Sequence, residues 1–429
     1  MKYSFTSQLK DLVGQKVALR GWVANLRSSG KIWFLELRDG AGFIQVVVNA
    51  SEATPEAIKV CEQLTTESSV EIQGLCVKHP KKDEYEVQAK EVKLVGKSIE
   101  YPIGKKEHGP DFLLDNRHLW LRAPSQWAVM RVRNTIISAT YDWFAQNNFV
   151  KFDSPILTPT SCEGTTELFK IDYFDEPAYL TQSGQLYLEA AIASLGRVFD
   201  FGPVFRAEKS KTRRHLTEFW MMDAEAAFVE HDENLKIQEE LISYIVEQVL
   251  LKCPVELKIL ERDTKPLQNV KPPFYRITHV EAVKILRDKG SDIGEMDDLG
   301  GDDETVLTQM YDKPIFVEKY PAAVKAFYMK RDPSDPTRVL NADLLAPEGY
   351  GEIIGGSQRE DDIELLVARM KEHNLPIKEF EWYLDTRRYG SVPHSGFGYG
   401  LERIVTWICG IKHVRESIPF PRLINRLRP

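Results

Sequence analysis

The spacing of hydrophobic residues changes along this chain of 429 residues and divides it into two differently built parts. Between residues 15 and 97 the apolar residues occur in short runs rich in β-branched and aromatic side chains, which is typical of β-strands. From Gln126 they recur every three or four positions, as in an amphipathic helix that continues to about Asn147. Because these two periods suit different secondary structures, the chain is expected to contain at least two domains.

The first part has the element order of a small β-barrel. Asp39-Gly40 is a hairpin signal between two of the predicted strands, and residues 54–64 are the one helical interruption. Five strands with one helix between the third and the fourth predict an OB-fold over residues 1–97. Residues 98–125, rich in proline and glycine, are expected to form a linker. The predicted strands cover residues 17–23, 33–38, 43–48, 69–74 and 85–94.

The second part, residues 126–429, mixes strands and helices without a regular βαβ alternation. This pattern favours an α+β domain built around an antiparallel sheet. Residues 255–350 contain several prolines and an acidic patch, so they are expected to form an insertion in this domain. After the helix at 126–147, further helices are expected near residues 185–196, 233–252, 279–289, 361–374 and 400–410.

Composition is that of a soluble enzyme with two or three domains. No apolar run is long enough to cross a membrane, and the five scattered cysteines are typical of reduced thiols in the cytoplasm. The net charge is −8, but residues 1–97 carry +2 and the remainder −10. Local cationic patches decide nucleic-acid affinity more than total charge, so an RNA partner is permitted but not indicated by charge alone.

Two stretches almost 190 residues apart each place an arginine among groups suited to ATP. In residues 205–219, Arg206-Ala207-Glu208 is followed by a basic loop and a returning strand with Phe219. In residues 396–403, a glycine-rich strand leads into Glu402-Arg403. Planar guanidinium groups donate several hydrogen bonds to phosphate at once, and glycines let a flat ring approach the backbone.

These two stretches closely resemble motifs 2 and 3 of the class II aminoacyl-tRNA synthetases. The resemblance implies that ATP bends between the two arginines while an amino-acid carboxylate attacks its α-phosphate. Arg206 would bridge the carboxylate and that phosphate, Arg403 would hold the γ-phosphate, and Glu352 would bind Mg2+. These three residues are the implied catalytic residues. The implied ATP-binding residues are Arg206, Glu208, Arg214, His215, Leu216, Phe219, Glu352, Gly398, Gly400 and Arg403.

The order of an OB-fold followed by such a core resembles the subgroup specific for aspartate, asparagine and lysine. Residues 149–157 resemble motif 1, which implies a homodimer formed through the region near Pro155. Lysine is disfavoured as the substrate because Arg359 stands where acidic side chains would be needed.

Between aspartate and asparagine the residues favour asparagine. Aspartate-specific members carry a lysine at the place of Leu188, and its loss removes a charge-assisted contact with a side-chain carboxylate. A carboxamide would donate to Glu208 and accept from Arg359. The basic loop and the C-terminal motif are also very similar to those of asparagine-specific bacterial members. The implied amino-acid-binding residues are Glu163, Gln182, Gln185, Arg206, Glu208 and Arg359.

The expected activity is ATP-dependent conversion of L-asparagine to its adenylate, with release of pyrophosphate, followed by transfer to tRNA(Asn). The resemblance places Phe34 under the central anticodon base, with Arg27 and Gln45 beside it, and aromatic residues on an OB sheet stack unpaired bases. An aspartate-activating enzyme that does not discriminate between tRNAs remains a second hypothesis, weakened by Leu188. A noncatalytic RNA-binding paralogue is a third, although Arg206, Glu352 and Arg403 are all present. An asparagine-forming paralogue is disfavoured because such enzymes generally lack the anticodon domain.

Overall fold

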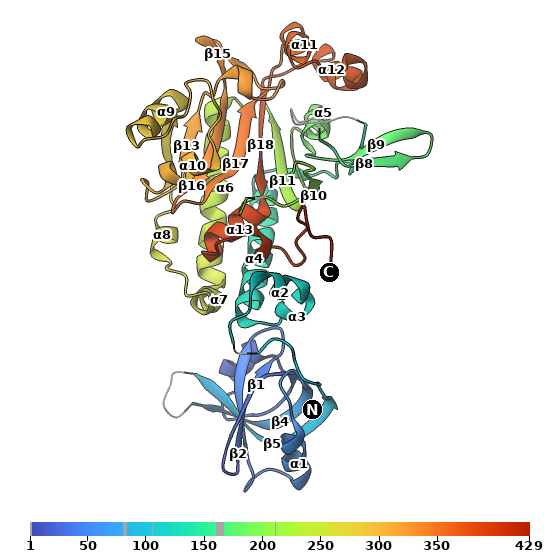
Figure 1. The fold of residues 1–429 in the computed structure, drawn as a ribbon, viewed down its shortest axis with the longest axis vertical. Helices are drawn as coiled ribbons and strands as arrows, with labels where there is room; N and C mark the ends of the chain where they lie inside the picture. Colours follow the sequence, from blue (N-terminus) through green and yellow to red (C-terminus); the bar gives the residue numbers. More distant parts are fainter. Residues whose placement is uncertain (1, 80–83, 105, 160–166, 211) are drawn as a thin grey trace. The chain divides into compact units, whose positions relative to one another are not determined.

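The structure, a computed structural model, describes residues 2–79, 84–104, 106–159, 167–210 and 212–429. The chain divides into two compact units, residues 1–113 and 114–429, which are described separately (Figure 1). Among the described residues, no helix combines the length and the hydrophobicity needed to cross a membrane.

Unit 1 is a closed five-stranded barrel with strand order β1-β2-β3-β5-β4. The single helix between β3 and β4 begins after Thr54, whose side chain accepts a hydrogen bond from the Ala57 amide as an N-cap. Inward-facing aliphatic residues of all five strands form one core, and the predicted OB-fold is confirmed. The elements are a 3-10 helix (Thr6–Leu12), β1 (Lys16–Ser29), β2 (Ile32–Arg38), β3 (Phe43–Asn49), α1 (Pro55–Gln63), β4 (Ser69–Lys78) and β5 (Tyr85–Gly96). α2 (Pro110–Asp115) spans the division between the units.

Unit 2 is built on an eight-stranded sheet with strand order β12-β13-β16-β17-β18-β11-β10-β6. Only the β12–β13 and β10–β6 pairs are parallel, so the predicted antiparallel α+β domain is confirmed. Its strands are β6 (Val150–Lys151), β10 (Arg197–Phe205), β11 (Glu218–Ala227), β12 (Tyr275–Thr278), β13 (Ile315–Glu318), β16 (Asn341–Ala346), β17 (Gly351–Gln358) and β18 (His394–Gly400). Strands outside this sheet are β7 (Leu157–Thr158), β8 (Lys170–Tyr173), β9 (Glu176–Leu180), β14 (Arg331–Asp332) and β15 (Asp335–Val339).

The helices α4 and α6 pack against each other, and α6 packs on β17 and β18 in the largest core (Figure 1). α4, α5, α6, α9, α11 and α13 confirm the predicted helices. The helices of unit 2 are α3 (Arg117–Trp120), α4 (Pro124–Gln146), α5 (Gln185–Leu195), α6 (His231–Lys252), α7 (Pro254–Ile259), α8 (Lys265–Gln268), α9 (His279–Asp288), α10 (Gly301–Thr308), α11 (Ile363–Glu372), α12 (Glu381–Arg388) and α13 (Leu401–Cys409). Short 3-10 turns occur at Ala322–Val324, Ile377–Phe380 and Val414–Glu416.

Two segments are more integrated with unit 2 than their composition suggests. The segment 255–350, expected as an insertion, supplies β12, β13 and β16 to the central sheet, where residues 315–317 are fully buried. Within the expected linker, Arg117 is only 1% exposed and donates to the carbonyls of Ile418 (2.9 Å) and Pro419 (2.8 Å). The prolines, glycines and acidic residues of these segments suggested a linker and an insertion, but the buried apolar and arginine side chains between them decide where the chain packs.

Candidate active site

The β10–β11 hairpin carries the first predicted motif. At its open end Val204 pairs with Phe219, and the Arg206 amide then donates to the Thr217 carbonyl at 3.0 Å. The loop between β10 and β11 therefore begins and ends at the same end of the hairpin. Arg206 and Phe219 consequently lie at the same end of the hairpin.

The second motif lies next to the first because β18 pairs with β11. In this register Asp223 lies opposite Gly398, and a Cβ at position 398 would collide with the Asp223 carboxylate. A Cβ at Gly400 would lie 3.9 Å from the Phe219 ring. Since α13 begins directly after Gly400, Arg403 is carried to the same end of the sheet as Arg206.

Arg403 meets Glu352 on the neighbouring strand β17. Its Nη1 donates to the Glu352 carboxylate at 2.7 Å and to the Glu352 backbone carbonyl at 3.1 Å. Burial disfavours the charge on Glu352, but Arg403, Lys325 and Arg206 outweigh it and lower the pKa of this carboxyl. The structure thus brings Arg403 into contact with Glu352, and Arg206 is near enough for its charge to act on this carboxyl.

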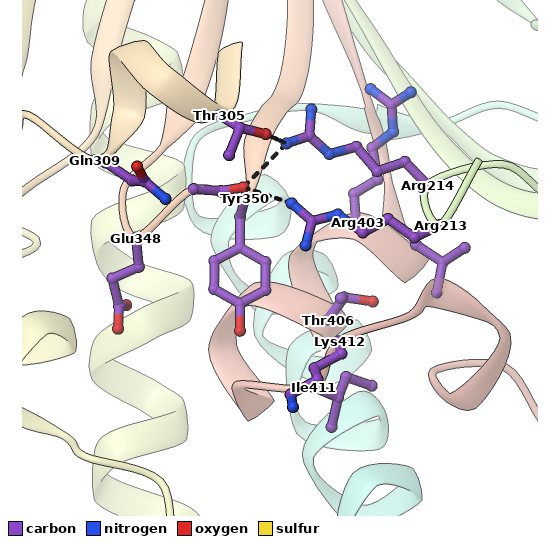
Figure 2. A pocket seen from close by; sticks show the side chains of 12 residues that line it. Arg213, Arg214, Thr305, Gln309, Glu348, Tyr350, Arg403, Thr406, Ile411 and Lys412 are labelled. Carbon is purple, nitrogen blue, oxygen red and sulfur yellow. Dashed lines mark hydrogen bonds between the residues drawn. The ribbon is translucent and has the colours of Figure 1, made fainter. Parts of the chain in front are cut away.

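Arg214 is held at a cationic pocket of about 200 Å³ (Figure 2). Its Nη1 donates to Glu304 at 2.7 Å, and its Nη2 donates to Thr305 (2.7 Å) and to the Gly349 carbonyl (2.9 Å). The basic side chains that line the pocket are Arg213, Arg214, Arg403 and Lys412. Phosphate is the kind of group that such a concentration of donors would bind.

His215 lies in the same cationic environment, since burial and the charge of Arg403 lower its pKa while Glu208 opposes this shift. Its Nδ1 contacts the Thr212 hydroxyl. The Glu208 carboxylate is therefore close to His215. The buried Leu216 packs with Val414 and anchors the end of the basic loop.

Asp343 on β16 is a second carboxylate close to Glu352. A Cβ at Gly355 would lie 3.2 Å from Glu352 Oε1 and 3.7 Å from Asp343 Oδ1. Lys325 donates to Asp343 at 2.9 Å. Burial, with Glu352 and Asp298 nearby, raises the pKa of Asp343 to about 6 although Lys325 opposes it.

Two such carboxylates fit Mg2+, which prefers carboxylate, phosphate and water oxygens in an octahedron. The described residues contain no group of three or more His, Cys, Asp or Glu side chains placed to hold a metal ion. A magnesium ion at Glu352 and Asp343 would therefore take its remaining ligands from phosphate and water.

Arg359 forms the centre of a second, deeply buried cluster. Its Nε donates to Glu225 at 3.0 Å, its Nη2 contacts the same oxygen, and its Nη1 donates to Ser357 at 2.8 Å. The guanidinium also lies 5.1 Å from the centre of the Tyr328 ring. The carboxylate next to Arg359 is therefore Glu225, whereas Glu208 lies beside His215.

Glu189 is the second anion of this cluster. Its carboxylate accepts from Gln185 (3.0 Å), Tyr383 (2.7 Å), Arg387 (2.5 Å) and His394 (3.1 Å). Burial disfavours this charge, but Arg387 and His394 outweigh it and lower the pKa of Glu189.

The structure describes some, but not all, of the residues that the sequence placed around the bound amino acid. Gln185 joins the cluster around Arg359 through Glu189, and Gln182, three residues before α5 begins, is 2% exposed. Leu188 is fully buried in an apolar cluster with Ile192 and Val198. Glu163 lies outside the described residues.

On unit 1, the three predicted anticodon residues lie together on β1, β2 and β3. The Arg27 guanidinium lies 4.7 Å from the centre of the Phe34 ring, and Arg27 also donates to the Gln45 side chain at 3.4 Å. The other end of the Gln45 amide donates to Glu86 at 2.9 Å, which orients this amide. Arg27 and Phe34 are cross-strand partners.

Sequence reasoning missed Glu225, Glu189 and Asp343. Glu225 could have been found, because residues 219, 221, 223 and 225 share one face of β11 when side chains alternate along a strand. Glu189 stands one turn after Gln185 in α5, so the sequence also indicated that these two side chains share one face of the helix. Asp343 had no comparable signal, because its closeness to Glu352 depends on the pairing of β16 with β17.

Two family models match the chain: "tRNA synthetases class II (D, K and N)" over residues 109–424, and "OB-fold nucleic acid binding domain" over residues 17–95. The structure of asparaginyl-tRNA synthetase from Pyrococcus horikoshii complexed with asparaginyl-adenylate is 45% identical, with a TM-score of 0.96 and full coverage of both chains. Asparaginyl-tRNA synthetase from Entamoeba histolytica, also with asparaginyl-adenylate, is 34% identical with a TM-score of 0.88 over 97% of each chain. Aspartyl tRNA synthetase from Entamoeba histolytica is 28% identical with a TM-score of 0.84, over 100% of this chain and 93% of that one.

The paired arginines, the buried carboxylates and the OB-fold agree with these matches along the whole chain. The chain therefore belongs to the class II tRNA synthetases of the D, K and N group and is a tRNA ligase.

Proposed function

We propose that this tRNA ligase activates L-asparagine with ATP, releases pyrophosphate and transfers the asparaginyl group to the 3′ end of tRNA(Asn). The observation that carries the choice of asparagine is the buried Arg359–Glu225 pair. A carboxamide oxygen accepts from Arg359 and its NH2 donates to Glu225, so one amide satisfies both groups. The two asparaginyl-tRNA synthetases with bound asparaginyl-adenylate support this choice.

The charge balance of the pocket also favours a neutral side chain. Arg359 and Arg387 are balanced by Glu225 and Glu189, so an aspartate carboxylate would bring an uncompensated charge into a buried site. Leu188 agrees with this reading because it packs in the core and offers no cation.

The chemistry requires two anions to be held together while charge builds on the α-phosphate. Arg206 donates to the asparagine carboxylate and to the α-phosphate. Arg214, with His215, and Arg403 hold the outer phosphates from two sides, while Phe219 stacks on adenine. Mg2+ on Glu352 and Asp343 would neutralise phosphate charge when bound. The leaving group is pyrophosphate, and no covalent bond to the protein forms.

The protein is further proposed to act as a cytoplasmic homodimer. Val150, Ile156 and Leu157, on either side of Pro155, are between 41% and 44% exposed. Val150 lies on β6 and Leu157 on β7, which are edge strands of two sheets, and exposed apolar residues of this kind are suited to burial against a second copy.

Amino-acid-dependent ATP–pyrophosphate exchange, with asparagine and aspartate tested in parallel, examines this function. Exchange with asparagine alone, followed by charging of a tRNA(Asn) transcript, is expected. Exchange with aspartate would instead indicate an aspartate-activating enzyme. Folded protein that binds tRNA but is silent with both amino acids would indicate a noncatalytic RNA-binding protein.

The preference for asparagine over aspartate is expected to increase as the pH rises from about 6 to about 8, by roughly fivefold to tenfold in the ratio of kcat/KM. Burial, with Glu189 nearby, raises the pKa of Glu225 to about 7 although Arg359 opposes it. Below this pH Glu225 gains a proton and no longer repels an aspartate side chain; above it the full repulsion is present. Pyrophosphate exchange measured with both amino acids across this range gives the ratio.

The variant Glu225→Gln removes the ionisable carboxyl of Glu225 and leaves Glu189 and His394 in the cluster unchanged. Its asparagine-to-aspartate ratio should be lower than that of the wild type and should not change with pH. A pH dependence that survives in this variant would assign the titration elsewhere.

Residues 1–97 are proposed to bind the anticodon through Phe34, and Phe34→Ala is expected to raise the KM for tRNA about tenfold to a hundredfold. Loss of one base–aromatic stack costs about 1–3 kcal/mol. Aminoacylation at varied tRNA concentration measures this change, with tRNA-independent exchange as the internal reference. The control is Phe5→Ala, which removes another aromatic ring of the same unit, 58% exposed. Equal KM values in the two variants would contradict the assignment.

A further inference from the structure

The helix α10 lies at the candidate ATP site. It belongs to the segment 255–350, which lies outside both synthetase motifs. Glu304 and Thr305 in this helix both accept hydrogen bonds from Arg214, 90 residues earlier in the chain. The side chains of Glu304 and Arg214 are each only 14% exposed, so this pair is shielded from water and salt. A surface ion pair of this kind would contribute little, but a shielded one can fix a side chain.

The three bonds leave the remaining N–H groups of Arg214 available. Glu304, Thr305 and the Gly349 carbonyl take one N–H of Nη1 and both of Nη2. The Nε–H and the second Nη1–H have no partner within the described ranges of the chain. Arg214 is thus oriented by the protein and still has donors for phosphate oxygens.

The same Glu304 oxygen also accepts from the backbone amide of Glu352 at 3.0 Å. The approach is close: a Cβ at Gly351 would collide with Glu304 and with Arg214, and this residue has a φ of 76°. Glu304 therefore links the arginine of one motif to the strand that carries the metal-binding carboxylate. Without this link, a long arginine on an exposed loop would lose rotamer freedom on binding ATP.

We propose that Glu304 and Thr305 are positioning residues that hold Arg214 ready for the outer phosphates of ATP and set its distance from Glu352. This inference rests on the proposed ATP-binding role of Arg214. It gives the acidic patch of the segment 255–350 a function in nucleotide binding rather than in packing alone. Neither residue is expected to touch asparagine, so their substitution should change the KM for ATP and not the KM for asparagine.

The test uses asparagine-dependent ATP–pyrophosphate exchange with the full-length chain. Glu304→Gln is expected to raise the KM for ATP about tenfold, because the ion pair with Arg214 becomes a weaker hydrogen bond from the guanidinium to a neutral carboxamide. The KM for asparagine and the melting temperature should stay close to wild type. Thr305→Val should shift the KM for ATP in the same direction by a smaller factor. Asp302→Asn is the matched control, since it removes an exposed charge from the same turn of α10 and should behave as wild type.

Arg214→Ala completes a double-mutant cycle with Glu304→Gln. If Glu304 acts through Arg214, the Glu304 substitution should have almost no further effect on the KM for ATP in the Arg214→Ala background. Additive effects in the cycle, or equal KM values for Glu304→Gln and Asp302→Asn, would overturn the inference. Wild-type protein without any exchange would instead contradict the proposed function itself.

Discussion

Arg206→Ala is expected to lower kcat/KM for asparagine-dependent ATP–pyrophosphate exchange by about a thousandfold. In the proposed function Arg206 bridges the asparagine carboxylate and the α-phosphate, and its charge contributes to the lowered pKa of Glu352. Its removal leaves two anions to approach without the donor aimed at the charge that develops between them. Initial rates at varied ATP and asparagine concentration measure the effect.

Arg206→Lys and Arg388→Ala are the comparisons for this variant. Lysine keeps the charge but loses the planar set of donors, so an intermediate loss is expected. Arg388 is a half-exposed arginine on α12 that pairs with Glu381 and Asp385, and its removal should leave exchange unchanged. Activity of Arg206→Ala within tenfold of wild type would place the carboxylate and the α-phosphate elsewhere.

Arg359→Lys is expected to lower kcat/KM for asparagine by about a hundredfold or more, while the KM for ATP stays near the wild-type value. The bonds to Glu225 and Ser357 leave one hydrogen on each terminal nitrogen of Arg359 without a partner among the residues described. These hydrogens suit a carboxamide oxygen, and an ammonium group cannot reproduce their fixed directions. Lysine still supplies a positive charge between Glu225 and Glu189, so the fold should survive.

Exchange kinetics with each substrate varied in turn, together with thermal unfolding, measure these effects. Arg369→Lys is the matched control, because Arg369 is also a buried arginine, 4% exposed, but bonds to Glu372 and the Ala322 carbonyl outside the pocket. A common loss of activity in both variants would point to general destabilisation. Unchanged asparagine kinetics in Arg359→Lys would remove Arg359 from amide recognition.

The OB-fold and the helices were predictable because each depends on residues close in sequence. The strand runs of β1 to β5 and the three- to four-residue spacing of α4 are local patterns. The motif residues Arg206 and Arg403 were also predictable, since each stands at a fixed distance from a strand or helix end. The five strands within 255–350, three of which belong to the central sheet, were missed because they are short and separated by polar segments.

The partners of the buried charged side chains, by contrast, depend on which strands and helices the fold places side by side. Arg359 and Glu225 are 134 residues apart, and Glu189 and Arg387 are 198 apart. The first contact exists because β17, β18 and β11 lie side by side in the sheet, and the second exists because α12 packs against α5. The sequence suggested that Glu208 and Arg359 bind the two ends of one carboxamide, whereas the glutamate that contacts Arg359 in the structure is Glu225. Both are glutamates, so composition and spacing alone could not distinguish them.

The sequence by itself determined the OB-fold strands and the main helices and indicated candidate residues for nucleotide activation, because propensity, periodicity and motif spacing act over a few residues. Only the tertiary structure decided that Glu225 faces Arg359, that Asp343 stands beside Glu352, and that α10 holds Arg214. The physical reason is that a buried charge requires a partner, and the partner is whichever side chain the sheet order brings within hydrogen-bond distance.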